Sequence, residues 1–167
     1  MNIATPTEAW PAAAFAGRRV VFRCDASQRI GSGHVMRCLT LADALRDCGA
    51  QCIFVCRAHE GHLLDLIQRR GHGAVALPAG ETGYQAPGRL AHDGWLGTDW
   101  TTDAQATRKA LSGQPVDWLV LDHYGLDQQW EAAMRPSCHR LLVIDDLADR
   151  RHDCDWLIDQ NLGRRTA

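Results

Sequence analysis

The stretch VVFRCDASQRIGSGHVMRCLTLADALRDCGAQCIFVC, residues 20–56, joins two apolar runs through a segment with helical spacing. Residues 20–22 form the first run, and a turn with two glycines follows it. Apolar residues then recur every three or four positions until Gly49 ends the pattern. Residues 52–56 form the second run and are apolar throughout. This order predicts a strand, a helix and a second strand that is parallel to the first.

The same alternation continues through the rest of the chain. Further strands are predicted at residues 74–77, 118–121, 141–144 and 156–158, and helices at residues 63–67, 103–111 and 130–134. Strands that are apolar throughout are typical of a parallel sheet covered by helices on both faces. The sequence therefore predicts an α/β fold with a doubly wound, mostly parallel, Rossmann-like sheet.

The composition is that of a globular protein of one domain. The chain has 167 residues, of which 46% are hydrophobic and 23% are charged. Its net charge of -2 predicts no binding to nucleic acid or to an anionic membrane. Residues 1–17 contain neither a basic start nor a long apolar run, so we expect no signal peptide or membrane span. We interpret them as a poorly ordered extension of a cytoplasmic protein.

The seven cysteines do not indicate a disulfide framework or a zinc site. Their number is odd, the chain is long enough for a core, and no two cysteines form a CxxC pair. Cys48 falls at a predicted helix end, whereas Cys52 and Cys56 fall in a predicted strand, so the three are not expected to converge on one ion. We expect buried, unpaired thiols.

Polar clusters follow several predicted strands, where ligands of parallel sheets collect. They comprise residues 25–34, the loop around Trp95, residues 122–124, and residues 145–146. The loop, residues 79–101, is rich in glycine and longer than most connections in a compact domain. Loops of this length are often functional or mobile, and this one is a candidate lid over a ligand.

The glycine turn at Gly31, Ser32 and Gly33 is neither a dinucleotide fingerprint nor a P-loop, because Met36 replaces the third glycine and no lysine is near. Its free N–H groups are candidates for binding a phosphate or an oxyanion. His34 follows at the predicted helix start, where the helix dipole disfavours an imidazolium and so favours a neutral base. Packing of His34 against the turn, with a bond to a neighbouring carbonyl, is an equally good interpretation.

The cluster at residues 122–124 offers three further side chains for the same edge of the sheet. Tyr124 is a candidate for orienting a sugar or phosphate oxygen, and Asp122 for fixing the tautomer of a histidine. For His123 we favour a structural role at the start of the next helix. The acidic segment at residues 145–153 has no metal-ligand spacing, and its arginines favour local ion pairs instead.

Four motifs, taken together, resemble the UDP-sugar hydrolases of pseudaminic acid biosynthesis, which act on UDP-2,4-diacetamido-2,4,6-trideoxy-β-L-altropyranose. They are RCDASQRIGSGHVMR at residues 23–37, WL at residues 95–96, VLDHYG at residues 120–125 and IDDLADRRHDCDWLIDQN at residues 144–161. They occur in the same order in that family and span nearly everything after Arg18.

The resemblance implies a glycosyltransferase-B-like enzyme that needs no metal or other cofactor. It implies that His34 activates a water molecule, which attacks the anomeric carbon with inversion and expels UDP. Tyr124 would line the site, and the substrate-binding residues would also include Arg23, Asp25, Gly31, Ser32, Gly33, Arg37 and Asp122. Nucleophilic catalysis by the protein has little support, because Ser32 is not in a GxSxG elbow.

The resemblance also implies a second domain that binds UDP and is not part of this chain. Residues 18–162 would then be the N-terminal Rossmann-like domain, and residues 163–167 the start of a linker. On its own such a domain should bind UDP weakly and catalyse poorly, because the base and the nucleotide site would be on different pieces. A glycosyltransferase of the same fold and a non-catalytic domain that binds a nucleotide sugar are the alternative functions.

Overall fold

The computed structural model describes residues 13–113 and 115–161. Its elements are β1 (Arg19–Cys24), α1 (Gly33–Asp47), β2 (Gln51–Arg57), α2 (Leu64–Arg69), β3 (Gly73–Leu77), η1 (Asp93–Trp95), α3 (Trp100–Ala110), β4 (Val116–Asp122), α4 (Gln128–Met134), η2 (Arg135–Ser137), β5 (Cys138–Ile144) and β6 (Trp156–Ile158). The strands form one six-stranded sheet in the order β3-β2-β1-β4-β5-β6. Every neighbouring pair is parallel. The chain is therefore an α/β protein with a Rossmann-like sheet, as the sequence predicts.

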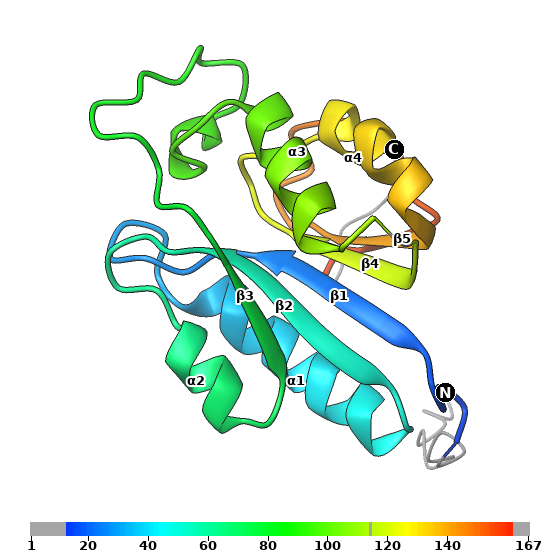
Figure 1. Cartoon of the computed structure of the whole chain (residues 1–167). Helices are drawn as coiled ribbons and strands as arrows, with labels where there is room; N and C mark the ends of the chain where they lie inside the picture. Colours follow the sequence, from blue (N-terminus) through cyan, green and yellow to red (C-terminus); the bar gives the residue numbers. More distant parts are fainter. Residues whose placement is uncertain (1–12, 114, 162–167) are drawn as a thin grey trace, which may run out of the picture.

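Helices cover both faces of this sheet. α1 and α2 lie on one face, and α3 and α4 lie on the other (Figure 1). Successive residues of a strand point to opposite faces, so Val20 and Phe22 pack in the cluster below α1 while Val21 packs in the cluster below α3 and α4. Burial on both faces explains why the central strands have apolar residues at every position.

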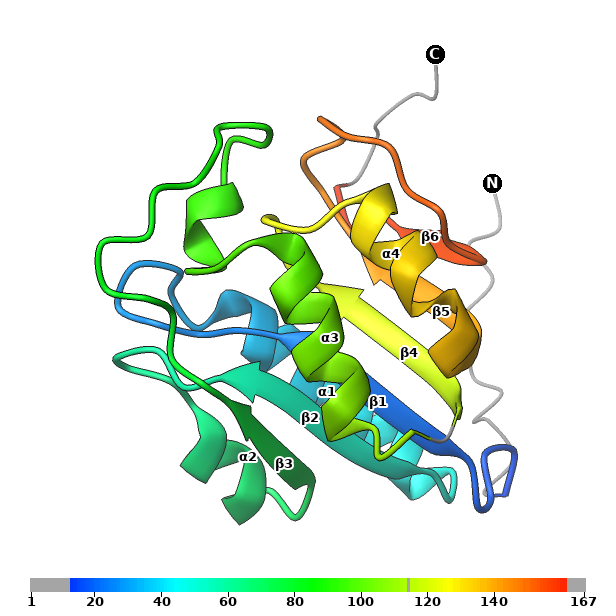
Figure 2. The same ribbon diagram turned by 45° about the horizontal axis from the view of Figure 1, so that its top comes forward.

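The order of the strands reverses its direction between β1 and β4. From the carboxyl end of β1 the chain turns to one face of the sheet and enters α1. From the carboxyl end of β4 it turns to the other face, towards α4 (Figure 2). In open parallel sheets this switch point opens a crevice where ligands bind. The fold thus points to the ends of β1 and β4 as the place to look for a site.

All predicted strands and helices are present, but α3 starts earlier than predicted. It begins at Trp100 rather than at residue 103 because Asp99 caps it. The Asp99 carboxylate accepts hydrogen bonds from the N–H groups of Thr101 and Thr102, at 3.0 and 2.9 Å. Such a cap satisfies donors that the first helical turn leaves free. The prediction missed it because the apolar periodicity starts only inside the helix.

The predicted extension at residues 1–17 is ordered at its described end. Residues 1–12 lie outside the described part of the chain, as does the predicted linker at residues 163–167. Residues 13–17 form a turn in which the Phe15 N–H donates to the Cys48 carbonyl at 3.0 Å and the Gly17 N–H donates to the Gly49 carbonyl at 3.2 Å. Phe15 also packs against the cluster below α1. These residues therefore belong to the domain.

The cysteines are unpaired, in agreement with the prediction. Five of them are buried: Cys24, Cys38, Cys52, Cys56 and Cys138. Burial raises the pKa of the Cys38 and Cys52 thiols to about 11, so both are protonated at neutral pH and behave as small apolar side chains.

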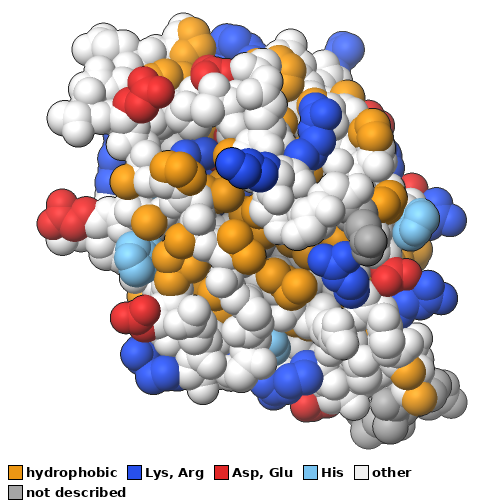
Figure 3. All heavy atoms as spheres, viewed as in Figure 1, with side chains coloured by type: hydrophobic (Ala, Val, Ile, Leu, Met, Phe, Trp, Pro, Cys, Tyr) orange, Lys and Arg blue, Asp and Glu red, His pale blue; other side chains and the backbone are white. Residues whose placement is uncertain are grey.

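Among the described residues no helix has the length and apolar character needed to cross a bilayer. On the face seen in Figure 3, Lys and Arg side chains are scattered among Asp and Glu side chains rather than gathered into one basic area. The exposed large hydrophobic side chains include all three residues of the edge strand β6.

Candidate active site

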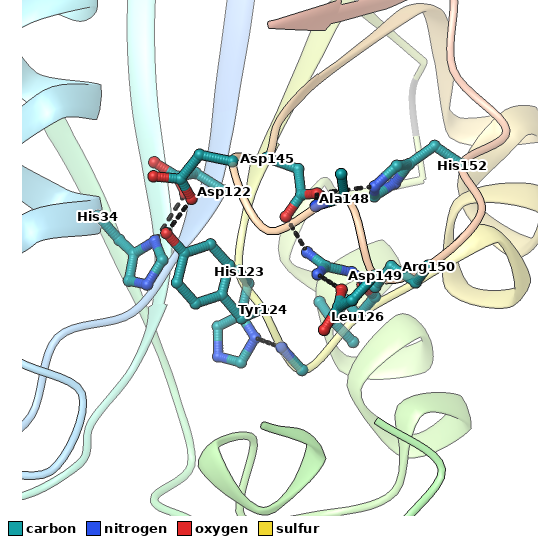
Figure 4. A network of polar contacts seen from close by, with 12 residues as sticks. His34, Asp122, His123, Tyr124, Leu126, Asp145, Ala148, Asp149, Arg150 and His152 are labelled. Carbon is teal, nitrogen blue, oxygen red and sulfur yellow. Dashed lines mark hydrogen bonds and ion pairs between the residues drawn. The ribbon is translucent and has the colours of Figure 1, made fainter. Parts of the chain in front are cut away.

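The switch point between β1 and β4 brings His34 and Asp122 together at the carboxyl end of the sheet. His34 is the second residue of α1, and Asp122 is the last residue of β4. The His34 Nδ1 atom lies 2.6 Å from Asp122 Oδ1 (Figure 4). The His34 side chain is 5% exposed and that of Asp122 is fully buried. A carboxylate in this position orients the imidazole and selects its tautomer.

The contact with Asp122 favours one tautomer of the ring, although Arg37 Nη2, a donor, also lies 3.0 Å from His34 Nδ1. The carboxylate accepts, so the hydrogen bond to it places hydrogen on Nδ1. In the neutral ring Nε2 is then unprotonated and able to accept a proton. No described side chain forms a hydrogen bond with Nε2. The ring therefore bonds the Asp122 side chain rather than a neighbouring carbonyl, and the role of His34 as a general base stays a prediction.

Arg37 holds the same carboxylate from the next turn of α1. Its Nε and Nη2 atoms donate to the two oxygens of Asp122 in a bidentate pair. The Cys38 thiol contributes a weaker contact to Asp122 Oδ2 at 3.5 Å. Burial alone would lower the pKa of Arg37, but the hydrogen bonds and charge of Asp122 outweigh it and raise the pKa well above its ordinary value. Arg37, expected to bind substrate, therefore has its guanidinium committed to positioning Asp122.

Tyr124 packs edge-on against His34, with the two ring centroids 4.4 Å apart. Its hydroxyl donates to Asp146, in the polar cluster after β5. Burial and this hydrogen bond both raise the pKa of Tyr124, so the phenol stays protonated at neutral pH. The structure thus places Tyr124 beside the candidate base, as expected, with its hydroxyl engaged by a neighbouring carboxylate.

Two aromatic residues from the long loop complete the surroundings of His34. Trp95, in η1, has its ring centroid 6.2 Å from that of His34. His92 packs edge-on against Trp95, with 4.3 Å between ring centroids, and its ring centroid lies 5.6 Å from that of Tyr124. Sequence reasoning noted Trp95 but missed His92, whose one signal is its position three residues before Trp95 in the same loop.

The loop is held there by a close backbone approach. Gly125, directly after Tyr124, has no room for a side chain, because a Cβ atom on it would lie 2.9 Å from the His92 carbonyl oxygen and 3.0 Å from His123 Cε1. The end of β4 and the loop are therefore in contact at this glycine.

Arg23 and Asp25, expected to bind substrate, are out of reach of a ligand. Both side chains are fully buried and form a bidentate ion pair, with distances of 2.7 and 3.0 Å. Arg23 also donates to Asp103 of α3 at 2.6 and 3.1 Å, and Arg57 pairs with the same carboxylate. Burial would raise the pKa of Asp25, but the charge of Arg23 and the contacts with His123 and Arg23 together outweigh it and lower the pKa far below its ordinary value. Their contacts support a structural role, joining the sheet to α3.

His123 is buried, but it does not cap the next helix as we expected, because Asp127 caps α4. Its side chain is buried, and Nδ1 accepts a hydrogen bond from the Gly125 N–H at 3.0 Å. The proton of the neutral ring is therefore on Nε2, which faces Asp25 Oδ2 at 3.3 Å. Burial is the main cause that lowers the pKa of His123, which keeps this ring neutral.

The glycine turn has the geometry of an open helix start. Gly31 has a φ of 81°, a conformation that favours glycine, and its N–H donates to the Ser27 carbonyl at 2.8 Å. Cβ atoms on Gly31 and Gly33 would meet nothing within 4 Å. The N–H groups at the start of α1 have no acceptor within the helix, since Met36 makes its first bond, to Ser32. Binding of an anion by Gly31, Ser32 and Gly33 stays a prediction.

The acidic segment after β5 forms local ion pairs. Arg150 contacts Asp145 at 2.7 Å and Asp149 at 2.8 Å (Figure 4). His152 contacts Glu131 of α4 at 2.7 Å. Burial would lower the pKa of His152, but its hydrogen bonds to Asp145 and Glu131 raise it to about 9. Across residues 13–113 and 115–161, no group of three or more His, Cys, Asp or Glu side chains is arranged to hold a metal ion.

No family model matches the chain, but a search of known proteins finds a distant relative. The chain is distantly similar to a UDP-sugar hydrolase. It is 24% identical over 143 residues to UDP-2,4-diacetamido-2,4,6-trideoxy-beta-L-altropyranose hydrolase of Campylobacter jejuni subsp. jejuni serotype O:2. The matched region is 86% of this chain but only 42% of that relative.

A solved structure with a related arrangement is that of BdcA in complex with NADPH. It is 16% identical, with a TM-score of 0.43, and the match covers 80% of this chain and 53% of the other.

Proposed function

We propose that the protein containing this chain hydrolyses a UDP-linked 2,4-diacetamido-2,4,6-trideoxy hexose, in pseudaminic acid biosynthesis. The similarity to a hydrolase of that substrate supports the substrate class. The observation that carries the chemistry is the His34–Asp122 pair, with Nδ1 bonded to the carboxylate and Nε2 left to accept a proton. A mechanism that activates water needs a positioned group that accepts a proton, and Nε2 of this pair is such a group.

In the proposed reaction a water molecule lies between His34 Nε2 and the anomeric carbon of the sugar. Its oxygen forms a bond to that carbon while the bond from the carbon to the phosphate oxygen breaks, and UDP leaves with the electron pair. The water proton passes to Nε2, and the resulting imidazolium is stabilised by the fully buried carboxylate of Asp122. Attack from the face opposite the leaving group inverts the anomeric configuration.

The other residues around His34 have supporting roles in this proposal. Arg37 donates to both oxygens of Asp122 and holds this carboxylate in place, so that the imidazole points in one direction. Tyr124 and Trp95 cover the ring and limit the access of bulk water. The start of α1 offers N–H groups and a positive dipole end to the diphosphate.

The chain spans 42% of the relative, and we propose that further residues of the whole protein bind UDP. The proposal needs no metal or other cofactor, because UDP departs as a stable anion and the protein supplies the base.

The test is a comparison of His34→Ala with the unchanged protein, both in the full-length form and with the UDP-sugar as substrate. We expect kcat to fall by about 100-fold or more, the usual contribution of a general base. His62→Ala is the matched control, because His62 lies in the loop before α2, away from the pair. A kcat within threefold of the unchanged protein would exclude His34 as the base.

Hydrolysis in water labelled with oxygen-18 tests which bond breaks. Attack at the anomeric carbon places the label in the sugar, whereas attack at phosphorus places it in UDP. A glycosyltransferase would release little free sugar in buffer without an acceptor, so the amount of sugar released separates the two functions.

A further inference from the structure

A pocket lies next to the candidate active site, at the carboxyl ends of β1, β2 and β3. It has a volume of about 420 Å³, within the range of sites for small ligands. It lies where three loops come side by side, after β1, after β2 and after β3 (Figures 1 and 2). The lining residues include Gln28, Arg29, Glu60, Glu81, Tyr84 and Trp95. His34 is not among them.

The loops around this pocket are tied to one another. The two ends of the loop after β3 are in contact. The Glu81 N–H donates to the Gly97 carbonyl at 2.8 Å, and a Cβ atom on Gly80 would lie 2.8 Å from Gly97 Cα. The loops after β1 and β2 are joined through Gln28, whose N–H and side-chain amide both donate to Glu60 at 3.0 Å. These contacts hold the walls of the pocket together, and the role of residues 79–101 as a lid stays a prediction.

The lining is suited to a neutral ligand that donates hydrogen bonds. Glu60 and Glu81 present carboxylates, which accept hydrogen bonds from hydroxyl and amide N–H groups. The guanidinium of Arg29 is directed to the Gly94 carbonyl at 3.4 Å. Two carboxylates against one guanidinium disfavour a diphosphate. Trp95 and Tyr84 add aromatic surface for the apolar face of a ligand.

Trp95 connects this pocket to the candidate base. It lines the pocket, and its ring also approaches His34, at 6.2 Å between centroids. A ligand that has one end in the pocket, beside Trp95, can reach His34 with its other end. In a nucleotide sugar, we match this pocket to the N-acylated sugar. Its amide N–H groups can donate to the two carboxylates, and its methyl groups can pack on the two aromatic rings.

We propose that the pocket between residues 27–30, 59–60 and 80–97 binds the N-acylated sugar of the substrate through Glu60 and Glu81, while the nucleotide stays outside it. This inference rests on the proposed function for the identity of the sugar, and it adds a binding site that determines specificity.

The experiment replaces Glu81 with Ala in the full-length protein. Glu81 is exposed and has a loop position, so the fold should tolerate the change. Loss of a charge-assisted hydrogen bond corresponds to about a tenfold change in affinity. We expect KM for the UDP-sugar to rise about tenfold with kcat within twofold, and the affinity for the free 2,4-diacetamido-2,4,6-trideoxy sugar, measured by ligand-observed NMR, to fall by a similar factor. The affinity for UDP alone should not change.

Asp47→Asn is the control for a general loss of negative charge, because Asp47 is 76% exposed at the far end of α1. Unchanged KM and unchanged binding of the free sugar in Glu81→Ala would overturn the pocket proposal while hydrolysis by the parent protein still stands. Weaker binding of UDP in Glu81→Ala would also overturn it. Conversely, binding of the free sugar that depends on Glu81, in a protein that does not hydrolyse the UDP-sugar, would support the pocket and reject the proposed function.

Discussion

At the scale of single residues, Asp122 is the centre of the site. Its two oxygens accept from His34, Arg37 and Cys38, and its side chain is fully buried. Such a carboxylate has no rotational freedom left, and the imidazole attached to it has little. The precision of the proposed base therefore comes from a residue that does not itself contact the substrate.

This role gives a prediction for Asp122→Asn. The amide can no longer stabilise an imidazolium, and it can present its NH₂ group to His34, which favours the wrong tautomer. We expect kcat to fall by about 100-fold or more while KM stays within threefold, as measured by release of UDP. Asp65→Asn, an exposed position in α2, is the control. If kcat and KM both remain near the parent values, Asp122 has only a structural role.

Part of this site could be predicted from residues alone. A histidine at a helix start and an aspartate at a strand end were both recognisable, because each follows from local sequence and from the geometry of parallel sheets. The partners of Arg23 could not be predicted, since Asp103 is 80 residues away and belongs to a helix on the other side of a long loop. His92 lacked any pattern of its own, because its position depends on the path of that loop.

At the scale of elements, α3 is attached to the sheet by charge as well as by apolar packing. Asp103, in its first turn, is fully buried and accepts hydrogen bonds from Arg23, Arg57 and the Trp130 indole N–H. These contacts join β1, β2, α3 and α4 at one carboxylate. Removing one member of a buried ionic group leaves the others without compensation.

Asp103→Asn should therefore destabilise the domain strongly. We expect the free energy of unfolding in urea to fall by about 3–5 kcal/mol, because Arg23 and Arg57 lose a charged partner. The kcat of the fraction that remains folded should be unchanged, since Asp103 does not contact the proposed base. Loss of less than 1 kcal/mol would contradict the structural role that we assign to Arg23 and Asp25.

At the scale of the whole molecule, the sequence predicted the architecture well because it depends on repeated local patterns. Six apolar runs became six parallel strands, and the helices between them cover both faces. The boundaries were less predictable, as the start of α3 at Trp100 shows, because a side-chain cap and not apolar periodicity determines it.

The stability of the whole molecule should depend on pH through His152. Its folded-state pKa of about 9 lies above the value of about 6.5 for an unfolded chain. Its contribution is therefore fully present below pH 6.5 and is lost as the pH rises through 9. We expect His152→Gln to be less stable than the parent by about 1–2 kcal/mol at pH 6, after a discount for partial exposure. The difference should disappear by pH 10, in urea titrations of both proteins. A difference that is constant with pH would contradict this assignment.

The backbone contact between Gly125 and the His92 carbonyl has a consequence for how such a protein can diversify. Any side chain at position 125 would push the end of β4 away from the loop that contains His92. Trp95 belongs to the same loop, so its indole would move away from the His34 imidazole. The loop itself makes this contact through a main-chain oxygen, which every amino acid provides. Residues of this loop can therefore change while its contact with the end of β4 persists, as long as position 125 remains glycine; under the proposed function, such changes would alter which sugars the site accepts.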